Sequence, residues 1–224
     1  MGVTCQAACV ICDIDGFSGN NPGNTGGNPP PGYCTFAVHS VEWLGFIAGT
    51  TNLTLEFAVS NCTAGGGNGL EAGIYEGIDC QNFMLVSNCE TAIFNNTSVF
   101  ISNTVPLTIG QYYWLVVDSN GGNACDYEIN VTAGSTQVPP LTTTGHIMGD
   151  LTTCPGATID YQTTTVFGGS DYDWTLNGAP VGDGEEVTIT YSAPGVYNLC
   201  VQASNACSMA VPTCVLVNVV PLPP

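Results

Sequence analysis

The sequence predicts an all-β protein in which two disulfide-rich β-sandwich domains follow one another. Three observations lead to this prediction. The 224 residues suffice for two hydrophobic cores. The twelve cysteines are far more than a reducing compartment favours. Short β-branched or aromatic runs are separated by Gly, Asn and Asp, and long helix-forming stretches are missing from the pattern.

Strand-length runs occur at the spacing that is typical of a sandwich or a jelly roll. In the first half of the chain we expect strands at 40–48, 52–60, 71–76, 82–87, 98–102, 111–117 and 127–131. In the second half we expect them at 158–164, 171–176, 186–191, 195–203 and 213–219. The first domain is therefore predicted to be jelly-roll-like, and the second a further sandwich.

Proline-rich punctuation divides the chain. Val138-Pro139-Pro140 follows a strand-like run, and the ending from Val220 to Pro224 repeats this pattern. We expect a first domain at 1–135 with a cysteine-rich N-terminal segment, a Pro/Thr linker at 136–144, and a second domain at 145–224 with a proline-rich tail. Eight cysteines fall in the first part and four in the second, both even numbers, as expected if each domain closes its own bridges.

The chain contains no Lys or Arg, while Asp and Glu together number 18. Nucleic-acid binding requires cationic side chains at the phosphates, so this class of partner is excluded. No apolar run is long enough to insert into a membrane as a helix. Stability must come from burial, backbone hydrogen bonds and disulfides, because ion pairs with Lys or Arg cannot form.

The run from Pro106 to Asp118 resembles the pre-peptidase C-terminal type of β-sandwich. That family has a G-x-Y-Y strand, which is matched here at Gly110, Tyr112 and Tyr113. Gly110 permits the turn, and alternation places Tyr112, Trp114 and Val116 on one face of the strand.

Residues 141–220 resemble a PKD-type immunoglobulin-like module. Tyr172 and Trp174 match its Y-x-W strand, while Gly195, Tyr197 and Leu199 fall in a strand similar to its G-x-Y-x-V strand. The resemblance implies an immunoglobulin-like sandwich with Trp174 in its core and Tyr197 nearby. The four cysteines depart from the pattern of most such modules.

In style, the cysteine-rich pair of domains resembles modules of large surface proteins of Bacteroidota that are exported by the type IX secretion system. Those proteins are adhesins, fibre or sheath components, and occasionally hydrolases. The resemblance implies an extracellular or cell-surface location, as a mature bacterial form or a fragment of one, and it carries no active site.

Three disulfides are predicted, two from local patterns and the third as the pair that remains. Cys80 and Cys89 bracket a hairpin-length segment, and alternation places Cys200 and Cys214 outward on neighbouring strands. Cys154 is then left for Cys207. The pairing of the other six is open; they are Cys5, Cys9, Cys12, Cys34, Cys62 and Cys125.

The spacing of Cys5, Cys9 and Cys12 also matches the ligand run of radical-SAM iron-sulfur enzymes. Such clusters need reduced thiolates and an α/β barrel, so we favour an N-terminal disulfide knot that includes Cys34. A zinc site at Cys9 and Cys12 lacks a second matching pair.

A calcium site is the one cofactor that the sequence suggests. Asp13 and Asp15 precede Gly16, and Asn20 follows, so oxygen ligands alternate as in the first half of a calcium loop. The closing bidentate Glu is missing, and an Asx-rich turn is the alternative.

No catalytic set is evident, and we expect no enzyme activity. His39 and His146 are the only histidines, and neither has the context of a Ser/His/Asp triad.

We expect an extracellular structural or adhesive protein, for example the repeating subunit of a surface filament or sheath. Its partners would be further copies of itself, or other surface proteins and glycans. The alternative is a non-catalytic carbohydrate-binding accessory region of a secreted hydrolase. Tyr113, Trp43 and Tyr75 are its first binding candidates, although core packing is the favoured role of each.

Overall fold

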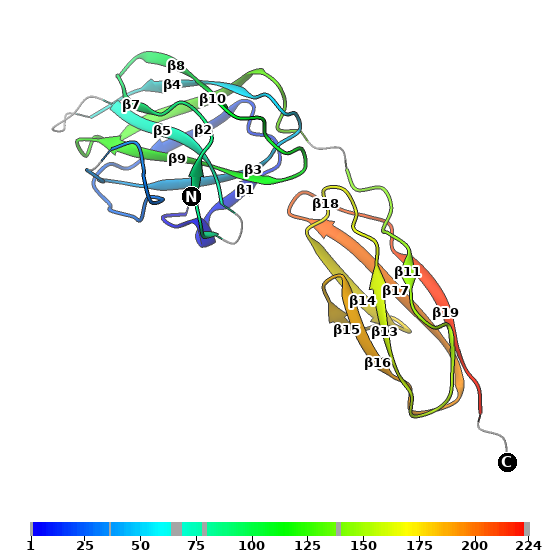
Figure 1. Cartoon of the computed structure of the whole chain (residues 1–224). Coiled ribbons are helices and arrows are strands. Elements are labelled where there is room, and N and C mark those ends of the chain that lie inside the picture. Colours follow the sequence, from blue (N-terminus) through cyan, green and yellow to red (C-terminus); the bar gives the residue numbers. More distant parts are fainter. Residues whose placement is uncertain (1, 36, 64–68, 78–79, 138–139, 222–224) are drawn as a thin grey trace. The chain divides into compact units, whose positions relative to one another are not determined.

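The computed structural model describes residues 2–35, 37–63, 69–77, 80–137 and 140–221. The chain divides into two compact units, Met1–Val138 and Pro139–Pro224 (Figure 1). Both consist of strands joined by turns and loops; a 3-10 turn, η1 (Cys5–Ala7), precedes the first strand. Within the described residues, no helix has the length and apolar character to cross a membrane. The all-β prediction is confirmed.

Two sheets form the first unit, and Figure 1 shows them as two layers. One sheet has the order β1-β3-β9-β5-β6, with β7 also paired to β5; the other has the order β2-β10-β4-β8. The strands are β1 (Cys9–Ile11), β2 (Phe17–Asn21), β3 (Glu42–Ile47), β4 (Thr54–Ser60), β5 (Gly69–Glu76), β6 (Met84–Leu85), β7 (Glu90–Ile93), β8 (Thr97–Ser102), β9 (Tyr112–Asn120) and β10 (Cys125–Ala133).

The first unit has two hydrophobic clusters because β3, β5 and β9 are covered on both faces. The inner face packs against β4 and β10, and Leu115 lies in this core. The outer cluster contains Trp43, Trp114 and Val116 together with Cys5 and Tyr33 from the N-terminal segment. A strand buried on both faces reads as a continuous apolar run, which explains the composition of β3 and β9.

The second unit is a smaller sandwich. Its sheets have the orders β11-β13-β16 and β12-β19-β17-β14-β15, with β18 also paired to β17. Its strands are β11 (Ile147–Met148), β12 (Thr152–Thr153), β13 (Thr158–Thr163), β14 (Asp171–Leu176), β15 (Ala179–Asp183), β16 (Glu186–Thr190), β17 (Gly195–Asn205), β18 (Ser208–Met209) and β19 (Thr213–Val219). Trp174 is fully buried, as predicted, and its indole N–H donates to the Gly184 carbonyl at 2.9 Å.

Every predicted strand overlaps an observed one, and the division between the two units falls within the predicted linker at 136–144. Thr136 is buried in the first unit, where its hydroxyl accepts a hydrogen bond from the Ile14 amide. Leu141 and Thr144 are buried in the second unit. Thr136 thus packs with the first unit, and Leu141 and Thr144 pack with the second. The proline-rich end from Leu222 onward lies outside the described residues.

Candidate functional site

The disulfides of the first unit tie its N-terminal segment to the sheet. Cys5 bonds to Cys80 and Cys34 bonds to Cys89, so the predicted pair of Cys80 with Cys89 is wrong. The stretch between Cys80 and Cys89 is not a hairpin. The strand within it, β6, and the strand after it, β7, both pair with β5 and not with each other. Cys80 and Cys89 are instead each bonded to the N-terminal segment, which covers the outer face of the sheet.

Cys62 bonds to Cys125, a pair that the sequence left open. The Cys200–Cys214 bridge is confirmed, and these residues are direct cross-strand partners in β17 and β19. The predicted pair of Cys154 with Cys207 is wrong, because Cys154 is free and exposed after the edge strand β12. Cys207 is disulfide-bonded.

The N-terminal cysteine run does not offer three thiolates to a cluster. Cys5 and Cys12 are disulfide-bonded, whereas Cys9 is free and exposed. Among the described residues, no group of three or more His, Cys, Asp and Glu side chains is arranged to hold a metal ion.

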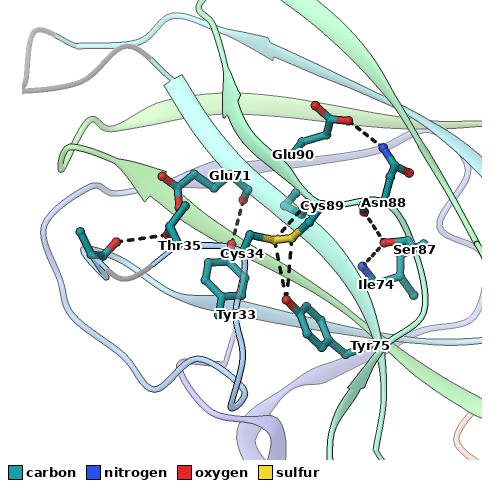
Figure 2. Close-up of a disulfide and its surroundings, with 12 residues drawn as sticks. Tyr33, Cys34, Thr35, Glu71, Ile74, Tyr75, Ser87, Asn88, Cys89 and Glu90 are labelled. Carbon is teal, nitrogen blue, oxygen red and sulfur yellow. Dashed lines mark hydrogen bonds between the residues drawn. A yellow bond between two sulfur atoms is a disulfide. The ribbon is translucent and has the colours of Figure 1, made fainter.

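The Cys34–Cys89 bridge lies at the centre of a polar network. Figure 2 shows the Tyr75 hydroxyl pointing toward both sulfurs, at 3.7 Å from Cys34 Sγ and 3.9 Å from Cys89 Sγ. The Tyr33 ring stacks on Tyr75 with 6.1 Å between the ring centroids, and its hydroxyl donates to the Glu71 carbonyl at 3.2 Å. The bridge and its neighbours thus fasten the N-terminal segment onto β5.

Two buried carboxylates complete this attachment. Glu71 on β5 and Asp118 on β9 are direct cross-strand partners, and both side chains are buried. Asp118 accepts hydrogen bonds from the backbone N–H groups of Ser40, at 2.6 Å, and His39, at 3.2 Å. Glu71 accepts from the Thr35 hydroxyl at 2.5 Å, as Figure 2 shows. Thr35, His39 and Ser40 are therefore held by acids that have no Lys or Arg partner.

Burial governs the protonation of these acids. It raises the pKa of Glu42 to about 7, although the hydrogen bond from the Tyr127 hydroxyl, at 3.2 Å, opposes the shift. It raises the pKa of Glu71 to about 6, and it also raises the pKa of Asp118. Removing a carboxylate from water disfavours its charged form, and few nearby positive charges offset this cost.

We expect the first unit to be about 2 kcal/mol more stable at pH 5 than at pH 8, after allowance for solvent screening. The pKa values of Glu42 and Glu71 are higher in the folded than in the unfolded state, so folding favours their protonated forms. This contribution is complete below the unfolded pKa near 4.5, and it is lost as the pH rises through the folded values of about 6 and 7. Chemical denaturation at several pH values measures it.

The double variant Glu42→Gln/Glu71→Gln should flatten this pH dependence. Glu128→Gln is the matched control, since it removes a carboxylate from an exposed position of the same unit. Equal slopes in the double variant and the wild type would show that the buried acids are not the cause.

The sequence does contain a signal for these buried acids. Glu42, Glu71 and Asp118 stand within otherwise apolar strands of a chain that has no cation to pair with them. An acid in such a position is either functional or structurally bonded.

The two histidines lie in different units. The His39 amide binds Asp118, and its buried Nδ1 has no hydrogen-bond partner among the described residues. His146 is exposed, and its amide donates to the Thr164 hydroxyl at 3.0 Å.

The three predicted calcium ligands do not come together. Asp13 accepts from the side chains of Thr136, at 3.1 Å, and Gln137, at 3.0 Å, and Asp15 accepts from the Val131 amide at 2.7 Å. Asn20 lies on β2 and lines a different hollow. The polypeptide turns after Asp15 and runs as an extended strand, which carries Asn20 away from the acids. Calcium binding itself stays a prediction.

The hollow that contains Asn20 is formed by β2, β10 and the end of β4, and its volume is about 520 Å³. Its lining residues are Ser18, Gly19, Asn20, Ser60, Asn61, Asp126, Tyr127 and Glu128. The Asp126 carboxylate accepts from the side-chain amides of Asn61, at 2.9 Å, and Asn20, at 2.7 Å, and these bonds lower its pKa. Asp126 therefore remains a carboxylate. No local sequence pattern predicts this hollow, since its residues come from three separate segments.

The aromatic residues predicted to bind carbohydrate are not accessible. Tyr113 and Trp43 are each 2% exposed and Tyr75 is 0% exposed. Tyr113 packs in the core between the sheets, and the other two lie under the N-terminal segment. Core packing, the favoured role for these three residues, is thus confirmed, and they are not candidates for binding carbohydrate.

No protein-family model matches the sequence, and no curated protein matches it either. Among solved structures, the PKD domain of the human VPS10 domain-containing receptor SorCS2 is 20% identical, with a TM-score of 0.30, over 37% of this chain and 79% of that domain. Fibronectin(III)-like modules of Clostridium thermocellum CbhA are 16% identical, with a TM-score of 0.34, over 79% of this chain and 88% of theirs.

The chain also spans 38% of a β-1,2-glucanase from Parabacteroides distasonis, at 10% identity over 94% of this chain and a TM-score of 0.29. Similarities at these TM-scores assign no function. The resemblances to pre-peptidase C-terminal domains and to exported surface proteins of Bacteroidota stay predictions.

Proposed function

We propose that the chain is a non-catalytic structural or adhesive protein of the cell exterior that associates with further copies of itself. The observation that carries this proposal is that the cysteines and the buried carboxylates of the chain form bonds within the protein. Ten cysteines are disulfide-bonded, and the buried carboxylates of Glu71 and Asp118 accept hydrogen bonds from a neighbouring chain segment. These groups bond to other parts of the same chain and so close the fold.

A raised carboxyl pKa inside a protein often marks a catalytic acid, so a catalytic role has to be considered for Glu42 and Glu71. Their exposed fractions are 6% and 4%, which leaves little access for a substrate. Both accept a hydrogen bond from a hydroxyl group, of Tyr127 and Thr35 respectively. We therefore assign them a structural role.

Sheet edges offer a route to association. β1 and β12 are terminal strands of their sheets, and each pairs in parallel with a single neighbour. Unpaired edges of this kind accept strands from other chains. The free thiol of Cys9 lies on β1, and that of Cys154 directly follows β12.

Sedimentation velocity and negative-stain electron microscopy of the purified protein test this proposal. We expect concentration-dependent assemblies under oxidising conditions, with and without calcium. The variant Cys9→Ser/Cys154→Ser is the control that separates edge pairing from covalent cross-linking. Dispersed monomers at high concentration in every condition would contradict self-association.

A further inference from the structure

The outer face of the sheet β2-β10-β4-β8 presents a preformed polar site. Asn61 lies directly before Cys62, and Asp126 lies directly after Cys125, so the Cys62–Cys125 disulfide holds them together. The backbone of Thr63 donates to the Ala124 carbonyl at 2.8 Å, and the Ala124 amide donates to the Thr63 hydroxyl at 3.2 Å. The geometry of the Asp126 hollow is thus fixed without a ligand, which reduces the entropic cost of binding one.

The hydrogen-bonding groups of this hollow suit hydroxyl groups. Each Asp126 oxygen already accepts one amide N–H and keeps a further lone pair. The side-chain carbonyls of Asn20 and Asn61 are acceptors, and the Ser18 and Ser60 hydroxyls both donate and accept. A sugar hydroxyl likewise donates and accepts, so neighbouring hydroxyls of one ring can use several of these groups together.

Charge disfavours an anionic ligand on this face. Asp126, Glu128 and Glu56 all lie on this face. Asp126, Glu128 and Asn130 are two positions apart along β10 and so point to the same side, and Glu56 is the cross-strand partner of Asn130. The chain has no Lys or Arg to neutralise an anion there. Acidic polysaccharides, phosphates and nucleic acids would be repelled.

An exposed aromatic ring shares the face. Phe100 is 59% exposed on β8 and pairs with Glu56 of β4, while Asp126 pairs with Ser60 of the same strand. Four residues along β4 and two strand spacings separate Phe100 from Asp126 by about 16 Å. A sugar chain that is anchored at Asp126 can extend along the sheet and pack a ring face on Phe100.

We propose that this face binds a neutral oligosaccharide, with ring hydroxyls on Asp126, Asn20 and Asn61 and a sugar ring on Phe100. The inference deepens the proposed function, on which it rests, because it names the class of partner for adhesion. A divalent cation is the rival ligand, and it is disfavoured because the described residues contain no acidic group of three arranged around one point.

Binding to an array of neutral and acidic glycans tests the proposal, followed by calorimetry with the best neutral oligosaccharide. We expect Asp126→Asn and Phe100→Ala each to weaken binding at least tenfold. Asp160→Asn is the matched control, since Asp160 is an exposed strand carboxylate that also accepts a side-chain hydrogen bond, from Thr188 at 2.7 Å. It should bind as the wild type does. Circular dichroism and thermal unfolding check that each variant is folded.

Several outcomes would overturn the proposal. These are the absence of binding to any neutral glycan, preference for acidic glycans, or wild-type affinity in folded Asp126→Asn and Phe100→Ala. Terbium luminescence that depends on Asp126 without any glycan would assign the hollow to a cation instead. Assemblies that persist without glycan binding would refute this inference alone, whereas monomers that bind glycans would refute self-association alone.

Discussion

Replacement of Cys34 and Cys89 together by alanine is expected to lower the free energy of unfolding of the first unit by about 4 kcal/mol. The bridge spans a sequence separation of 55 residues, so its loss frees a long loop in the unfolded chain. It also removes the sulfurs beside the Tyr75 hydroxyl and loosens the segment that covers the outer cluster. Guanidinium denaturation followed by tryptophan fluorescence measures the change, because Trp43 and Trp114 lie in that cluster.

The variant Cys200→Ala/Cys214→Ala is the matched control. Its bridge spans a separation of only 14 residues, for which we expect about 3 kcal/mol, confined to the second unit. The transition of the first unit should not move. A loss of less than about 1 kcal/mol on removal of Cys34 and Cys89 would contradict the role given to that bridge.

Trp174→Ala is expected to destabilise the second unit by about 4 kcal/mol. The side chain is fully buried at the centre of a small core, and truncation leaves a cavity there. It also leaves the Gly184 carbonyl without the indole N–H that donates to it. Thermal or guanidinium unfolding of the variant, followed by circular dichroism, measures the loss.

Trp174→Phe is the control for this prediction. It keeps an aromatic ring and loses only the hydrogen bond and part of the volume, so it should cost about half as much. A small effect of Trp174→Ala would mean that the core does not depend on this residue.

The parts of the fold set by local patterns could be predicted from the sequence. Alternation along β17 and β19 placed Leu199 inward and the two cysteines outward, so the Cys200–Cys214 bridge followed. The Asn177-Gly178 turn, with φ of 52° and 82°, indicates a hairpin, yet β15 was missed because all of its side chains are exposed and show no alternation.

The features that depend on distant segments could not be predicted. Nothing near Cys34 or Cys89 indicates that the N-terminal segment crosses the outer face of β5, and the local hairpin was the simpler interpretation. The three predicted calcium ligands lie apart for a related reason. The prediction treated residues 13–20 as one loop, whereas β2 begins at Phe17 and places Asn20 beside Asp126. Contacts between segments far apart in sequence decided both results.

The central claim is that disulfides from the N-terminal segment to the sheet, with buried acids beside them, hold the first unit together. The most direct measurement is mass spectrometry of the unreduced protein, alkylated in denaturant and digested with pepsin. The account predicts alkylation at Cys9 and Cys154 only, and linked peptides that contain Cys5 with Cys80 and Cys34 with Cys89. Alkylation throughout, or a peptide that joins Cys80 to Cys89, would contradict it.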